Sequence, residues 1–179
     1  IGTETAIAET FTALQKYAKE LKERGVTLAV CSKNDFKNAK EGFEHPESIL
    51  TFDDFTSFKA NWDPKHQNIM DTAKEINIGI DSLVFIDDNP VERDIVLSQV
   101  PSVSVPNVGD DVIHFIKYID RNGYFEPISL LADDINRNQY YEDNKKRAVK
   151  ESTFKSYDEF LLSLDMTADI KSFSSIYLD

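Results

Sequence analysis

The apolar positions alternate between helical spacing and short continuous runs. Residues 7–21 carry apolar side chains at intervals of three and four, which predicts an amphipathic helix that ends at Gly25. Residues 26–31 form an apolar run rich in β-branched side chains, which is typical of a buried strand. A polar helix is predicted over residues 35–42.

The alternation continues through the middle of the chain. Asp63 and Pro64 predict a helix start, with Asp63 as the N-cap and Pro64 at the first position, and the helix ends at residues 77–79. Residues 83–86 are a second apolar run and predict a strand. A helix follows it to about residue 100.

That last helix has a strong start signal. Asn89 is the expected N-cap, Pro90 occupies the first helical position, and Glu92 is expected to complete a capping box. Residues 103–105 predict a short third strand, and residues 112–119 one more amphipathic helix. Strands that alternate with helices indicate an α/β fold with a doubly wound parallel sheet.

The character of the chain changes after residue 128. We expect an α/β core over residues 1–128 and a helical appendage over residues 129–179 that leads toward a further segment. Residues 130–150 are compatible with a helix, and residues 166–170 alternate like a strand. Ser156 with Glu159 predicts a capping box at the start of a short helix that ends at Leu164.

Composition narrows the classes of function. The chain has 179 residues, with 32 acidic and 20 basic side chains and a net charge of −12. This balance argues against general binding of nucleic acids or anionic membranes. The 41% hydrophobic content suffices for a core, no apolar run is long enough to span a membrane, and a single cysteine predicts a reducing, cytoplasmic environment.

Two acidic residues follow the second apolar run. The helix cap leaves Asp87 and Asp88 unexplained, and two carboxylates about 4 Å apart repel by about 4 kcal/mol at an effective dielectric constant near 20. A raised pKa on one acid or a bound cation relieves this repulsion, and oxygen ligands near a phosphate suit Mg²⁺. We therefore favour a functional role over simple capping.

Two further residues occupy positions where ligands bind in parallel sheets. Ser32 follows the first strand, where its hydroxyl either caps the next helix or helps to form a phosphate cradle; spacing alone does not separate these. Lys65 lies in the first turn of a helix, where a cation opposes the helix dipole unless acids or an anion compensate. A solvated surface lysine is the alternative. Cys31 is expected to be a small buried hydrophobe.

The order of these features resembles a known superfamily. The segments AVCSKND, FKANWDPK and LVFIDDNPVERD look like motifs II, III and IV of the haloacid dehalogenase (HAD) phosphatases, and specifically of the FkbH-like branch. The segment GYFEPISLLADDINRNQYYEDN is similar to that branch as well. The resemblance covers nearly the whole chain and implies a HAD-like fold and Mg²⁺-dependent phosphoryl transfer.

The resemblance also implies a role for each motif residue. Ser32 would bind the transferring phosphoryl group with the backbone of Lys33, and Lys65 would neutralise phosphate charge. Asp88 would bind Mg²⁺ directly, and Asp87 directly or through the second coordination shell. The implied substrate is a small phosphorylated metabolite, and the finer expectation is loading of a glyceryl unit from a phosphorylated three-carbon donor onto an acyl carrier protein.

One motif of the superfamily is missing. No apolar strand in the sequence is followed by the Asp-x-Asp of motif I, whose first acid is the nucleophile, and neither Asp53-Asp54 nor Asp120 fits the pattern. The chain begins with Ile1, so we expect that this motif and the first strand of the core lie upstream. The piece by itself is then expected to be inactive.

Parts of the sequence are compatible with two other functions. A carrier-docking or scaffold domain would use the basic cluster Lys145, Lys146, Arg147 and Lys150, although cations in a last helical turn also favour the helix dipole. A phosphoacceptor receiver domain also uses acids, a hydroxyl and a lysine, but in a different order along the chain. We therefore set the receiver domain aside.

Overall fold

The computed structural model describes residues 5–126, 140–165 and 167, with gaps at 142, 145, 148 and 155. The chain divides into two compact units, residues 1–143 and 144–179. The expected boundary at residue 128 lies outside the described residues and stays a prediction. None of the helices among the described residues is long and apolar enough to cross a membrane.

The N-terminal unit contains a small parallel sheet and surrounding helices. Its α-helices are α1 (Ala6–Glu23), α2 (Phe36–Glu44), α3 (Lys65–Ile76), α4 (Pro90–Gln99) and α5 (Phe115–Arg121). Three short 3₁₀ turns are η1 (Phe52–Asp54), η2 (Ile80–Ser82) and η3 (Val112–His114). The strands are β1 (Ala29–Ser32) and β2 (Ser57–Ala60), which pair in parallel with Ala29 opposite Ser57.

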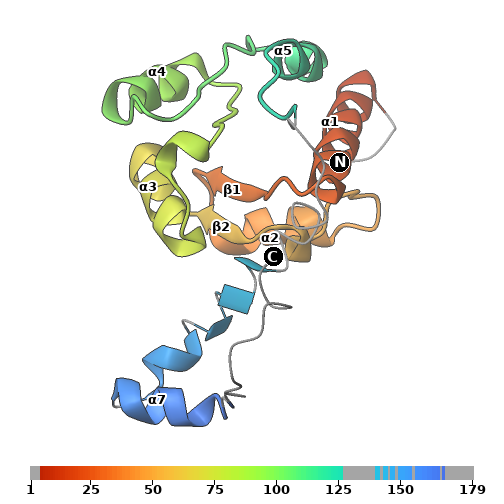
Figure 1. Cartoon of the computed structure of the whole chain (residues 1–179). Helices are drawn as coiled ribbons and strands as arrows, with labels where there is room; N and C mark the ends of the chain where they lie inside the picture. The colour runs from red at the N-terminus through yellow and green to blue at the C-terminus, as the bar shows by residue number, and fades with distance from the viewer. Residues whose placement is uncertain are drawn as a thin grey trace, which may run out of the picture. The chain divides into compact units, whose positions relative to one another are not determined.

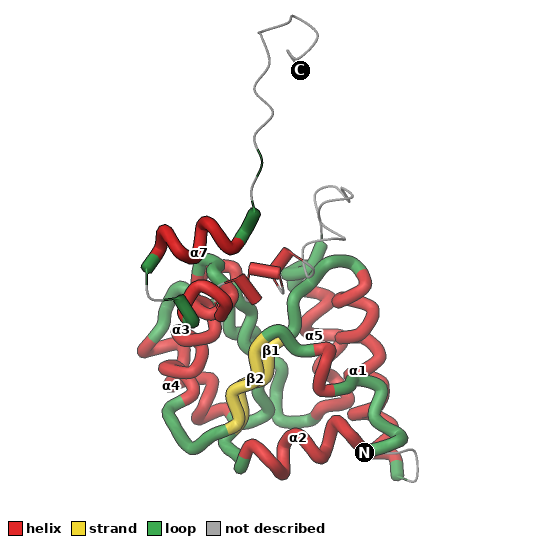
Figure 2. The backbone as a smooth tube through the Cα atoms, turned by 90° about the horizontal axis from the view of Figure 1, so that it is seen from below, coloured by secondary structure: helices red, strands yellow, loops and turns green. Residues whose placement is uncertain are grey.

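The sheet lies between two groups of helices. In both views α3 and α4 lie on one side of the strands, and α1 and α5 lie on the other (Figure 1, Figure 2). A mixed helix and strand architecture with parallel strands is thus confirmed, whereas a continuous doubly wound sheet stays a prediction.

The first predicted strand begins later than expected. Gly25 adopts a left-handed conformation with φ +93°, and the backbone N–H of Val26 donates to the carbonyl of Leu21 at 3.0 Å, so residues 25–26 close the end of α1. The strand therefore starts at Ala29. It runs to Ser32 and ends at the position where ligands bind in parallel sheets.

The predicted strands at residues 83–86 and 103–105 are reduced to one parallel bridge, between Val84 and Ser104. Two backbone hydrogen bonds join them, from Phe85 N–H to the Ser104 carbonyl (2.9 Å) and from Ser104 N–H to the Leu83 carbonyl (3.1 Å). Among the described residues, neither segment pairs with β1 or β2. The single bridge between Val84 and Ser104 is too short to form regular strands.

Residues 83–86 nevertheless separate two parts of the core. Phe85 packs in a cluster with side chains of α3 and α4, whereas Ile86 packs against a cluster that includes residues of α1 and α5. Successive side chains of an extended segment point to opposite faces, which explains this division. The apolar pattern therefore predicted a segment packed against the core, of which Phe85 is buried and the other three residues are half-buried, but it did not predict the hydrogen bonding.

The C-terminal unit is small and helical. Within it, residues 144–152 are helical wherever they are described, and α7 spans Tyr157–Ser163 (Figure 1). Ser156 caps α7 as predicted, because its Oγ accepts the N–H of Glu159 at 3.3 Å. The predicted strand at residues 166–170 lies outside the described residues, apart from residue 167.

Candidate functional site

The two acids of the predicted site have different environments. Asp87 is buried, with 7% of its surface exposed, whereas Asp88 is exposed. The Asp87 carboxylate accepts hydrogen bonds on both oxygens, from the Lys65 ammonium at Oδ2 and from the Asn89 backbone N–H at Oδ1 (2.9 Å). The pair therefore consists of one fixed, neutralised carboxylate and one carboxylate that faces solvent.

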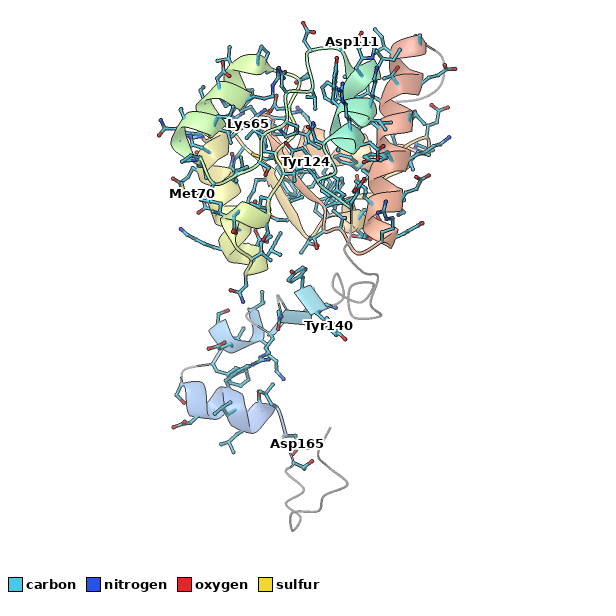
Figure 3. All side chains as sticks on the ribbon, turned by 45° about the horizontal axis from the view of Figure 1, so that its top comes forward. Lys65, Met70, Asp111, Tyr124, Tyr140 and Asp165 are labelled. Atoms are coloured by element: carbon cyan, nitrogen blue, oxygen red, sulfur yellow. The ribbon has the colours of Figure 1, made fainter. Side chains whose placement is uncertain are left out.

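Lys65, labelled in Figure 3, is the first residue of α3 and lies in the first turn, as predicted. Its side chain is only 12% exposed. The ion pair with Asp87 supplies the compensating charge that a lysine at a helix N-terminus requires. The expected cap was wrong: Pro64 is the N-cap residue, and no side chain caps this helix. The N–H of Asp63 instead donates to the Asn61 Oδ1 (3.1 Å), which holds Asp63 in the preceding turn.

Ser32 is the last residue of β1 and is half-buried, and Lys33 follows it. The Ser32 carbonyl accepts the N–H of Asn61 at 3.1 Å, which ties the β1 end to the β2 end. Lys33 extends to α4, where its Nζ lies 2.5 Å from Glu92 Oε1. The predicted capping box is therefore wrong: Asn89 caps α4 through the N–H of Val91 at 2.9 Å, but the Glu92 carboxylate binds Lys33.

Cys31 lies among these charged groups. Its Sγ lies 3.7 Å from the Lys65 carbonyl oxygen, and its side chain contacts the α3–α4 core cluster. Burial, opposed by Lys65 and assisted by Asp87 and Glu92, raises the pKa of the thiol to about 11. Cys31 is therefore a neutral thiol at the edge of the site, and it is half-buried rather than buried as the sequence predicted.

Sequence reasoning missed Arg93, which fixes the backbone of the acid pair. Its Nη1 donates to the carbonyls of Asp87 (2.7 Å), Asp88 (3.0 Å) and Gly109 (2.9 Å), and the residue is 8% exposed. No local pattern marks an arginine that binds backbone carbonyls, because its partners come from a turn and from a loop sixteen residues away.

The donor set suits Mg²⁺ with the help of a phosphate or water. Mg²⁺ usually binds one or two carboxylates and completes its shell with water and substrate phosphate. Asp88 offers an exposed carboxylate, and Asp87 lies beside it. Among the described residues, no group of three His, Cys, Asp or Glu side chains forms a site from protein ligands alone. The acid pair therefore fits a metal that is shared with a phosphate.

Comparison with known proteins gives one informative match. The chain is similar to the crystal structure of the N-terminal part of a protein from Bacteroides fragilis, which contains a phosphatase domain and was solved in complex with Mg. The sequences are 44% identical, and the TM-score is 0.69. The match covers 72% of this chain and 35% of the solved one. The matched part shares its fold with that protein.

Other comparisons give no match. No protein-family profile matches this sequence, and no curated protein matches it. The FkbH-like branch and the carrier protein therefore stay predictions. Of the basic cluster near residue 147, Lys145 lies outside the described residues, and the Lys150 Nζ lies 3.4 Å from the Ser163 carbonyl oxygen within the C-terminal unit.

Proposed function

We propose that the chain forms the phosphate- and magnesium-binding part of a HAD-type phosphatase that acts on a small organic phosphate. The observation that carries this proposal is the buried Lys65–Asp87 pair, which lies beside the exposed Asp88. Its support from outside the chain is the Bacteroides protein, whose similar structure contains a phosphatase domain with Mg.

Each side chain of the site has a task in phosphoryl transfer. The Ser32 hydroxyl and the Lys33 backbone N–H would donate to phosphoryl oxygens, and Lys65 would share its ammonium protons between Asp87 and the phosphate. Asp88 would bind Mg²⁺ directly, with Asp87 next to it. When bound, Mg²⁺ offsets the negative charge that the phosphoryl oxygens carry.

The nucleophile would come from a further strand. Within residues 5–126, β1 pairs only with β2, and no backbone hydrogen bond joins it to residues 83–86. An additional strand between these segments, ending in the Asp-x-Asp of motif I, would complete a doubly wound sheet and place a carboxylate near Lys65. We therefore expect phosphate binding, but no turnover, from the 179-residue chain.

The finer expectation, glyceryl loading onto an acyl carrier protein, rests on the sequence resemblance alone. No contact among the described residues favours a three-carbon donor over another phosphate ester. The proposed reaction is therefore phosphoryl transfer from a small organic phosphate in general.

Calorimetric titration with inorganic phosphate tests the proposal. We expect the chain to bind phosphate more tightly with MgCl₂ than without it, and Lys65→Ala to weaken binding at least about tenfold, which corresponds to about 1.4 kcal/mol. Ser32→Ala should weaken binding by a smaller factor, because backbone donors remain.

Lys74→Ala is the matched control, since Lys74 lies in the last turn of the same helix and its side chain is 77% exposed. It should leave phosphate affinity unchanged. The proposed site would be contradicted if the wild type, Lys65→Ala and Lys74→Ala bound phosphate with equal affinity. A phosphate affinity that is the same with and without MgCl₂ would contradict it as well.

A further inference from the structure

The turn between β2 and α3 presents the chain's single tryptophan to solvent. Trp62 is 70% exposed, although large aromatic side chains are usually covered in folded proteins. The indole N–H of Trp62 donates to Asp35 Oδ1 at 3.0 Å, so the polar atom of the side chain has a partner. The faces of the ring need no hydrogen bond. The exposed ring therefore requires an explanation beyond hydrogen bonding.

The turn that carries Trp62 is firmly built. Asn61 and the buried Asn68 exchange two side-chain hydrogen bonds, at 2.7 and 3.2 Å, and Asn68 is only 3% exposed. The Asn61 backbone N–H also binds the Ser32 carbonyl at 3.1 Å. These contacts fix the turn at Asn61, and the bond to Asp35 orients the indole.

This turn lies at the edge of the proposed phosphate site. Trp62 follows the residue that is bonded to Ser32 and precedes Lys65 by three positions, and Asp35 follows Ser32 by three positions. A phosphate ester bound between Ser32 and Lys65 would therefore extend its organic part toward this region. A fixed aromatic face beside a phosphate site is suited to stacking against a flat group.

Charge and size narrow the choice of ligand. Asp35 and Asp63 are both exposed and flank Trp62, so a second negative charge on the organic part would be repelled. The other exposed aromatic near this turn, Phe36, makes edge-to-face contacts with Phe52 and Phe58. Trp62 is the more exposed of the two side chains, at 70% against 49% for Phe36, and one indole face matches a single ring better than a protein interface.

We infer that Trp62 forms a subsite for the organic part of the substrate and that this part is an uncharged planar ring, as in an aryl or nucleoside monophosphate. The inference rests on the proposed function, because the phosphate group must be anchored at Ser32 and Lys65 for the ring to reach Trp62.

Fluorescence titration of the full 179-residue chain tests the subsite, since all tryptophan emission comes from Trp62. The probes are adenosine 5′-monophosphate, glycerol 3-phosphate and inorganic phosphate, each with MgCl₂. We expect the nucleotide to change the emission and to bind about tenfold more tightly than glycerol 3-phosphate. By calorimetry, Trp62→Ala should bring the two affinities within a factor of about two, and Trp62→Phe should keep part of the preference.

Ile7→Ala is the control, because it removes a side chain of similar exposure (72%) from α1 and should keep the full preference. Equal affinities for the nucleotide and glycerol 3-phosphate in the wild type, or an unchanged preference in Trp62→Ala, would overturn the subsite.

Lys65→Ala separates the subsite from the proposed function. If it weakens all three probes but no ring preference exists, the phosphate site stands and the subsite fails. If it weakens none of them, or if no probe binds to the wild type, the proposed function fails and the subsite fails with it. Ring binding that persists in Lys65→Ala would overturn the inference that the ring belongs to a phosphate ester.

Discussion

Two buried aspartates of the N-terminal unit are paired with lysine, but their surroundings differ. Asp54 is 5% exposed, and its Oδ1 lies 2.6 Å from Lys19 Nζ and 2.8 Å from Lys22 Nζ. Its Oδ2 accepts the backbone N–H of Thr51 at 2.8 Å and closes a capping box at η1. Asp87 is equally buried but lies beside a second, exposed carboxylate and a half-buried serine.

The comparison shows that a buried acid paired with lysine is not enough to indicate a ligand site. Asp54 joins α1 to η1, and each of its oxygens is satisfied within the fold. Asp87 lies after a strand-like segment, and its neighbour Asp88 keeps a carboxylate available to solvent. The difference is that the exposed carboxylate of Asp88 lies next to the Lys65–Asp87 pair. The predictions below test this distinction.

The largest expected effect on stability is at Asp54. Asp54→Ala removes four hydrogen bonds to a carboxylate, and the two lysines, which are partly exposed, regain water. We expect the free energy of unfolding in urea to fall by about 3 kcal/mol.

Asp53→Ala is the control for Asp54→Ala, because Asp53 is the adjacent acid and is exposed. It should change the free energy of unfolding by no more than about 0.5 kcal/mol. Phosphate affinity should be unchanged in both variants. Loss of phosphate affinity in a folded Asp54→Ala protein would remove the distinction between the two acids.

The site illustrates what sequence reasoning reaches. Ser32 lies at the end of β1 and Lys65 in the first turn of α3, as local patterns predicted, whereas Asp87 follows a segment that forms only an isolated bridge. The Arg93 contacts and the Lys33–Glu92 pair were missed, because their partners are brought together by tertiary packing.

The fold shows the same limit. Helix α1, the Asn89 cap and the Ser156 cap follow from local periodicity and side-chain chemistry, and the structure confirms them. The strand at residues 83–86 was not found as a regular strand, because ladder formation depends on neighbouring strands that a local pattern does not contain. The role of Asp88 in metal binding stays a prediction, because an exposed carboxylate is accessible to a metal ion but does not show that one binds there.

The next effect is the pH dependence of stability. The pKa of Asp54 is held below its ordinary range: burial alone would raise it, but the hydrogen bonds from Lys19, Lys22 and Thr51 outweigh burial. Because the pKa of Asp54 is lowered in the folded state, its carboxylate stabilises the fold above the ordinary carboxyl pKa of about 3.9. This contribution is lost as the pH falls toward the pKa of the folded state.

Urea unfolding of the wild type and Asp54→Asn measures this contribution. The two free energies should differ most near neutral pH and converge as the pH falls below about 4. A difference that stays constant between neutral pH and about pH 3 would show that the Asp54 charge does not contribute through its lysines.

We expect Asp87 to contribute less than Asp54 to the free energy of unfolding. Unlike Asp54, it is expected to contribute to the phosphate affinity. Asp87→Asn keeps an oxygen for one hydrogen bond and relieves repulsion with Asp88, but it leaves the 12% exposed Lys65 without its counter-charge, so the free energy of unfolding should fall by about 2 kcal/mol. The gain in phosphate affinity that MgCl₂ provides should fall severalfold, as measured by calorimetry. If Asp87→Asn costs as much stability as Asp54→Ala and keeps the full Mg²⁺ effect, Asp87 is a structural acid like Asp54.

The smallest expected effect uses the thiol of Cys31 as a local probe, because it lies beside Asp87 and Lys65. With a pKa of about 11, little thiolate is present at mildly alkaline pH, and reaction with an alkylating reagent should be about a hundredfold slower than for an ordinary free cysteine. Asp87→Asn removes an anion that raises this pKa, so the rate should rise a fewfold. Lys65→Met removes a cation that lowers it, so the rate should fall. Asp54→Asn, the matched control, should leave the rate unchanged, and a rise as large as that in Asp87→Asn would mean that general loosening of the fold exposes the thiol.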